Sequence, residues 1–146
     1  MHSIRVIPKL DIKGPNVVKG ICFDGYRVLG TPEKFAEIYY REGADELFLQ
    51  DVVASLYQRN NLLEIIKKTA KTAFIPLTIA GGIRSMEDIK MILRAGADKV
   101  AINTAAIENP SLLRDAANTF GSQCIVSSIE AKRLDNGRYE AWVDYG

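Results

Sequence analysis

Apolar positions along this chain follow two alternating patterns. Short runs that are continuously apolar or alternate with polar residues are separated by longer runs with helical spacing. The first pattern predicts β-strands and the second predicts amphipathic helices. The expected strands cover 5–11, 46–51, 75–80, 99–103 and 124–130, and the expected helices cover 31–42, 61–72, 86–95 and 110–120.

Helix start signals agree with this division. Thr31 precedes Pro32 at one helix start, and Ser85 precedes Met86 at another. Regular strand–helix alternation favours parallel pairing with right-handed crossovers, so the predicted class is α/β. No linker or low-complexity segment divides the chain.

Internal repeats narrow the architecture further. Residues 43–51 match 96–104 in pattern, and 7–13 and 126–132 both end in apolar–acid–apolar–lysine. Four β/α units therefore make one repeat, and the strand at 124–130 begins a second copy. Two copies would give eight units, the (β/α)₈ TIM barrel. We expect 1–146 to be a single partial barrel domain, the N-terminal half plus strand five, with a hairpin-like tail over 135–145.

Composition sets the broad class. The chain has 146 residues, 47% of them hydrophobic, and a net charge of +1. This suits a globular domain without a nucleic-acid or membrane partner. Cys22 and Cys124 form no CxxC pair, and His2 is the only histidine, so neither a metal site nor another cofactor is expected. The start lacks the apolar core of a signal peptide, so a cytoplasmic location is predicted.

Carboxylates occupy the ends of expected strands. In parallel β/α folds, working residues lie at the carboxyl ends of strands, where Asp11, Asp51 and Glu130 fall. Asp11 and Glu130 occupy equivalent repeat positions and would face each other across a closed barrel. Opposed carboxylates suit paired general acid and base chemistry. Helix capping or pairing with a lysine is the structural alternative for each acid.

Two neighbouring loops suggest phosphate binding. The segment 80–85 contains Gly81 and Gly82, whose backbone N–H groups can approach an anion, and a helix begins after Ser85. The next strand ends in Asn103 and Thr104, which add donors. A tight turn would also require glycine, so the paired loops carry this prediction together.

Charged residues elsewhere have two readings. The long connection 14–30 is typical of a binding loop or lid, and Lys19 and Arg27 are candidate anion contacts there, with solvated charge as the alternative. Arg5, Glu46 and Lys99 fall at the opposite strand ends. A ring of alternating charge there favours a stabilising salt-bridge cluster.

Several segments together resemble one known family. "LDIKGPNVVKG", "GADELFLQD", "IAGGIRSMEDI", "GADKVAINTAAIENPSLL", "TFGSQ" and "IEAKR" resemble the cyclase (synthase) subunit of imidazole glycerol phosphate synthase, of histidine biosynthesis. The resemblance runs from Ile4 to about Arg133. It implies a ribulose-phosphate-binding type of barrel, and a carbon–nitrogen lyase that uses ammonia from a glutaminase subunit on a phosphorylated substrate.

The resemblance also implies residue roles. It makes Asp11 and Glu130 the acid–base pair of ring closure. Lys19 and Asp51 would hold substrate, and Gly82 with the adjacent Gly81, Asn103 and Thr104 would hold phosphate. By the same resemblance, Arg5, Glu46 and Lys99 match three of four gate residues through which ammonia enters.

Two positions depart from the family pattern. Glu130 replaces the usual aspartate, and Lys9 replaces a small uncharged residue. Both look closer to a paralogous branch that amidates sugars for surface polysaccharide, also with glutaminase-derived ammonia. A third reading is a catalytically incomplete half-barrel that binds phosphate or self-associates through its open sheet edges.

Overall fold

A seven-stranded sheet forms the centre of the computed structural model, which describes residues 4–21, 25–53 and 59–142. His2 and Cys22 lie outside these ranges. The strand order is β3-β2-β1-β4-β5-β6-β7. The strands of this sheet are β1 Lys9–Lys13, β2 Asn16–Ile21, β3 Gly25–Gly30, β4 Leu47–Asp51, β5 Leu77–Ala80, β6 Lys99–Ile102 and β7 Ile125–Ser127.

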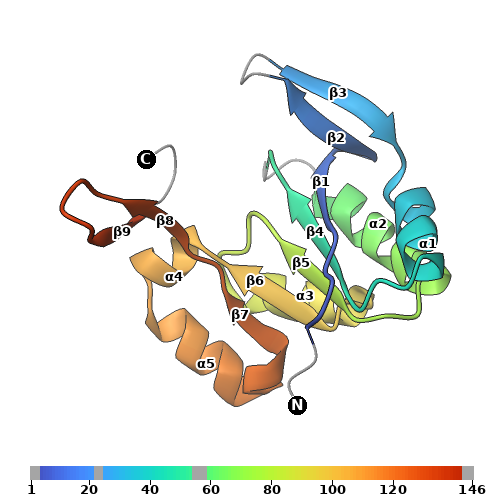
Figure 1. The fold of residues 1–146 in the computed structure, drawn as a ribbon. Helices are drawn as coiled ribbons and strands as arrows, with labels where there is room; N and C mark the ends of the chain where they lie inside the picture. The colour runs from blue at the N-terminus through green and yellow to red at the C-terminus, as the bar shows by residue number, and fades with distance from the viewer. Residues whose placement is uncertain (1–3, 22–24, 54–58, 143–146) are drawn as a thin grey trace.

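Helices connect the strands and lie along the outside of the sheet (Figure 1). They are α1 Pro32–Arg41, α2 Arg59–Thr72, α3 Met86–Ala95, α4 Thr104–Glu108 and α5 Ser111–Phe120, with a 3₁₀ turn at Ser122–Cys124. Strands β1, β4, β5, β6 and β7 are parallel. This confirms the predicted α/β class and the partial (β/α)₈ barrel.

The two faces of the sheet differ in chemistry. Along β1, Leu10 and Ile12 are buried in the core between sheet and helices. Lys9 and Asp11 alternate with them and therefore lie on the opposite face of the sheet, which we call the inner face. Leu49 of β4 and Val100 of β6 also belong to the core and are fully buried. Burial of apolar side chains on one face thus fixes which polar side chains point inward.

The repeated Gly-Ala-Asp segments fasten neighbouring strands. Asp45 Oδ2 accepts a hydrogen bond from the Val6 backbone N–H at 2.6 Å, on the segment leading into β1. Asp98 Oδ2 accepts one from the Leu77 N–H at 2.8 Å, at the start of β5. Each aspartate thus lies just before its own strand and bonds to the amino end of the strand that is its neighbour in the sheet, β1 for β4 and β5 for β6. These bonds explain the repeat structurally, because they set strand register at the amino ends.

Three expectations about secondary structure were wrong. The segment 14–30, expected to be a loop, forms the antiparallel hairpin β2–β3, which continues the sheet beyond β1. The segment was interpreted as one long connection before the first helix, but Val17 and Val18 are buried and support strand pairing. The short helix α4 precedes α5 where one helix was expected.

Across the described ranges, no helix is long and apolar enough to cross a membrane.

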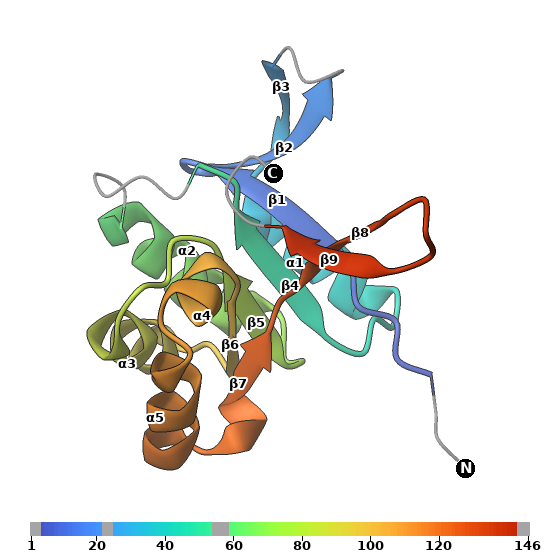
Figure 2. The same ribbon diagram turned by 90° about the vertical axis from the view of Figure 1, so that its left-hand side faces the viewer.

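The expected strand at 124–130 also divides in two. Ser127 ends β7, and the strand β8 Glu130–Arg133 pairs with β9 Tyr139–Trp142 in a separate two-stranded sheet. Figure 2 shows this hairpin on the side of the strands away from α2, α3 and α5. The chain leaves the main sheet after Ser128, whose N–H donates to the Ile102 carbonyl at 2.9 Å. Glu130 therefore begins a hairpin instead of ending a barrel strand.

Candidate active site

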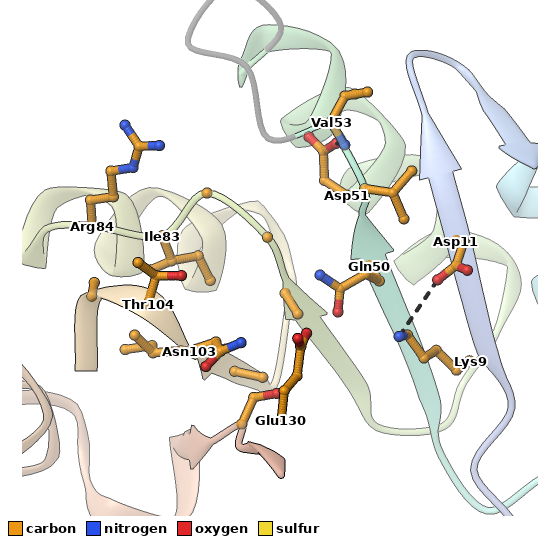
Figure 3. Close-up of a pocket in the computed structure, with 18 of the residues that line it drawn as sticks. Lys9, Asp11, Gln50, Asp51, Val53, Ile83, Arg84, Asn103, Thr104 and Glu130 are labelled. Atoms are coloured by element: carbon orange, nitrogen blue, oxygen red, sulfur yellow. Dashed lines mark hydrogen bonds and ion pairs between the residues drawn. The ribbon is translucent and has the colours of Figure 1, made fainter. Parts of the chain in front are cut away.

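A cleft of about 710 Å³ opens at the carboxyl ends of the parallel strands (Figure 3). Its lining comes from the ends of four strands, the segments that follow them, and the start of β8. The polar and charged side chains of the lining are Lys9, Asp11, Gln50, Asp51, Arg84, Asn103, Thr104, Glu108, Ser128 and Glu130. The predicted residues Gly81 and Gly82 also line it.

Asp11 and Glu130 reach the cleft from different elements. Asp11 comes from β1, while Glu130 comes from β8 and its carboxylate points into the cleft (Figure 3). The Asp11 Oδ1 atom is buried and has no hydrogen-bond partner among the described residues. The Lys9 ammonium lies 3.7 Å from this oxygen, an ion-pair distance too long for a hydrogen bond. Because Oδ1 is buried and the Asp11 side chain is 44% exposed, a substrate N–H or O–H would reach Asp11 through the exposed part of its carboxylate.

The loop after β5 that contains Gly81 and Gly82, which we call the glycine loop, packs closely against the end of β4. Gly81 has φ of +101°, and a Cβ atom there would lie 2.3 Å from the Asp51 carbonyl oxygen. Only glycine combines this left-handed backbone with so close an approach. Asp51 Oδ1 accepts a hydrogen bond from the Val53 N–H at 3.0 Å, which orders the turn after β4. Asp51 and Gly81 therefore shape one wall of the cleft together.

Ser85 and Asp88 form a capping box at the start of α3. Ser85 Oγ accepts from the Asp88 N–H at 3.2 Å, and Asp88 Oδ2 accepts from the Arg84 and Ser85 N–H groups, each at 3.0 Å. The Arg84 and Ser85 N–H groups are therefore already bonded within this turn. The expectation that the positive end of this helix helps to bind an anion stays a prediction.

Asn103 and Thr104 stand at the junction between β6 and α4. Both line the cleft, next to the glycine loop (Figure 3). The Asn103 Oδ1 atom is buried without a hydrogen-bond partner among the described residues. The Ala106 N–H donates to the Asn103 carbonyl at 2.9 Å, so of the first amides of α4 those of Thr104 and Ala105 lack an intrahelical partner. Two adjacent strand ends therefore offer a compact set of donors suited to a phosphate.

Lys19 and Arg27 do not join this cleft. They lie opposite each other on β2 and β3, and both are exposed. Neither belongs to the lining of the cleft. The expectation that they lie on a loop was wrong, because they belong to the paired strands β2 and β3. Their contact with an anionic substrate stays a prediction.

The predicted charge cluster forms at the opposite ends of the strands. Glu46 is only 5% exposed and accepts hydrogen bonds from both Arg5 Nη1 and Lys99 Nζ, the latter at 2.7 Å. Lys99 is the first residue of β6, and Glu46 immediately precedes β4. The three side chains thus form one ion cluster around a buried carboxylate.

Four polar cleft residues were not singled out from the sequence. Gln50 lies level with Asp11 in the pairing of β1 with β4, so strand register would have indicated it. Arg84, two residues after Gly82, contributes a guanidinium group to the cleft lining. Glu108 and Ser128 also line the cleft, but each depends on an element, α4 or the break after β7, that the sequence pattern did not predict.

The fold and the cleft define a class of protein: a β/α-barrel type whose polar site lies at the carboxyl ends of parallel strands. Within that class, a family model described as "Histidine biosynthesis protein" matches residues 5–144. The chain belongs to this family.

Individual relatives agree with this assignment. The chain is 59% identical, over all 146 residues, to a Legionella pneumophila protein named "Imidazole glycerol phosphate synthase subunit HisF", and covers 69% of it. A protein of the same name from Natranaerobius thermophilus is 46% identical over the whole chain, which covers 58% of that relative. A third, from Methanocaldococcus jannaschii, is 53% identical over 91% of this chain and 49% of its own length. The chain thus spans about half to two thirds of these relatives.

Proposed function

We propose that this chain supplies the first half of an ammonia-using cyclase site of the imidazole glycerol phosphate synthase type. The observation that carries the proposal is the cleft itself, which gathers Asp11, Glu130 and the donors around Gly82 and Asn103. Two carboxylates beside a phosphate-type cradle match the needs of acid–base chemistry on an anchored phosphorylated substrate. The HisF names of the relatives support the same reaction.

Each group has a distinct task in this proposal. The backbone N–H of Gly82, the amides of α4 and Thr104 hold one phosphate of a histidine-pathway ribonucleotide. Asp11 and Glu130, on different walls, transfer protons to and from the atoms that form the new ring. Ammonia reaches them from the end of the strands marked by the ion cluster around Glu46, along the inner face of the sheet.

The test is turnover of the ribonucleotide with ammonium salt, measured as imidazole glycerol phosphate formed. Asp11→Asn and Glu130→Gln keep shape but remove proton transfer, so each should lower kcat at least about 100-fold. Asp115→Asn, on the exposed side of α5, is the matched control and should leave the rate unchanged. Normal turnover by either cleft variant would refute the assigned chemistry.

The Lys9–Asp11 ion pair favours a second candidate, amidation of a sugar precursor. An ammonium group 3.7 Å from Asp11 adds a positive charge to the wall that proton transfer would use. An acceptor with its own carboxylate would find a counter-charge there. Product analysis separates the candidates: a ribonucleotide-derived imidazole supports the first, and an amidated or amidine-bearing sugar supports the second.

The partner proposed for either reaction is a glutaminase subunit at the strand ends that carry Arg5, Glu46 and Lys99. Glutamine-dependent turnover on adding such a subunit would support it, and turnover restricted to free ammonia would count against it. Self-association of the half-barrel is the remaining proposal, since β3 and β7 are the edges of the sheet. Light scattering at several concentrations tests it directly.

A further inference from the structure

The hairpin β8–β9 has two chemically different faces. Residues directly opposite each other in an antiparallel pair share a face, and the register pairs Glu130 with Trp142 and Lys132 with Glu140. These four side chains therefore share one face. The other face carries Ala131, Arg133, Tyr139 and Ala141. The face that reaches the cleft through Glu130 thus also carries the only tryptophan of the sequence.

Lys132 and Trp142 interact across this face. The Lys132 ammonium lies 4.0 Å from the centroid of the Trp142 ring, within cation–π range. Trp142 is directly opposite Glu130, and Lys132 is the next residue of β8 on the same face. The indole ring is therefore a shared neighbour of the cleft carboxylate and of the lysine. It is half-buried, whereas the rest of β8 and β9 is exposed.

The hairpin depends on its own contacts for order. Its two strands form a sheet separate from the main one, and residues 128 and 129 connect them to β7. An isolated two-stranded hairpin is only marginally stable in water. Because Glu130 is the first residue of this hairpin, the direction of its carboxylate is set by whether the hairpin pairing holds.

We propose that Lys132 and Trp142 are positioning residues for Glu130. Their contact holds the first pair of the hairpin closed and keeps the Glu130 carboxylate directed into the cleft. The proposal rests on the acid–base role proposed for Glu130. It assigns a function to a hairpin that contributes no other side chain to the cleft lining.

Acrylamide quenching of Trp142 fluorescence tests the contact without any assay of activity. Loss of a cation–π contact at an exposed site should lower the equilibrium constant for the closed hairpin about two- to fivefold. Lys132→Met should therefore raise the quenching constant, and Lys132→Arg should restore it, because arginine also stacks on indole. Arg133→Met is the matched control, since it removes the same charge from the same strand on the opposite face. Equal quenching in Lys132→Met and Arg133→Met would overturn the proposal.

Two further readouts connect the contact to Glu130. The backbone amide resonance of Glu130 should shift in Lys132→Met and stay in place in Arg133→Met; no difference between the two would overturn the proposal. Turnover of Lys132→Met should fall about two- to fivefold in kcat with KM unchanged, and recover in Lys132→Arg. If Glu130→Gln keeps full activity, the function proposed for Glu130 fails, while the quenching and resonance comparisons still decide the positioning role.

Discussion

Replacing Gly81 by alanine tests how strictly the end of β4 and the glycine loop fit together. At φ of +101°, an alanine pays a left-handed backbone cost of about 1–2 kcal/mol. Its Cβ would also lie 2.3 Å from the Asp51 carbonyl oxygen and 3.0 Å from the Asp51 Cβ. Backbone must move to relieve this overlap, which adds roughly 1–3 kcal/mol. We therefore expect Gly81→Ala to lower the free energy of unfolding by about 2–5 kcal/mol.

Gly43→Ala separates the two contributions. Gly43 also has a left-handed backbone, at φ of +85°, but a Cβ there would meet nothing within 4 Å. Its loss should be only the backbone cost of about 1–2 kcal/mol. Urea denaturation gives both values, with the slope m used to check that the unfolding transition is unchanged.

Function should follow the same difference. Movement of Asp51 and the loop changes the cradle, so Gly81→Ala should lose affinity for inorganic phosphate, measured by calorimetry. Gly43 does not line the cleft, and Gly43→Ala should bind phosphate normally. If Gly81→Ala were no less stable than Gly43→Ala and bound phosphate equally well, the fit between Asp51 and Gly81 would not matter.

The remaining predictions concern charged side chains. Glu46→Gln removes the buried partner of Lys99 and Arg5 and should cost roughly 1–3 kcal/mol in chemical denaturation; an unchanged midpoint would contradict the cluster. Asp45→Ala and Asp98→Ala each remove one bond to a backbone N–H and should each cost about 1 kcal/mol; a large cost for one alone would refute their equivalence. Lys9→Met should change kcat or acceptor choice without a measurable change in stability, because exposed ion pairs contribute little; Lys13→Met, on the same strand, is its control.

Most of the parallel sheet could be predicted from the sequence because burial imposes a period on each strand. Leu47 and Leu49, like Leu10 and Ile12, had to face the helices, and this fixed the inward direction of Asp11. The hairpin β2–β3 escaped prediction because the segment was interpreted as one long connection, whereas strand pairing there depends on a partner in β1. Local pattern cannot reveal a pairing made across the chain.

The site was predicted where it depends on strand ends and missed where it depends on irregular segments. Asp51 and Asn103 follow directly from where β4 and β6 end, and Asp11, in the middle of β1, follows from the inward-facing alternation of that strand. Glu130 was identified by its repeat position, equivalent to that of Asp11, but the break after Ser127 and the hairpin that carries it were not anticipated. At that break the chain changes the strand with which it pairs: Ser128 still bonds to Ile102 of β6, whereas Glu130 pairs with Trp142 of β9. No sequence periodicity records this change.

The bonds made by Asp45 and Asp98 have a consequence for how such a protein can diversify. Both anchor strand alignment at the amino ends, at the opposite ends of the strands from the cleft. Residues could therefore be inserted or deleted after β4, β5 or β6 without sliding the strands against one another. The cleft and the bonds that align the strands lie at opposite ends of the same strands, so the lining of the cleft can change while the scaffold stays in place.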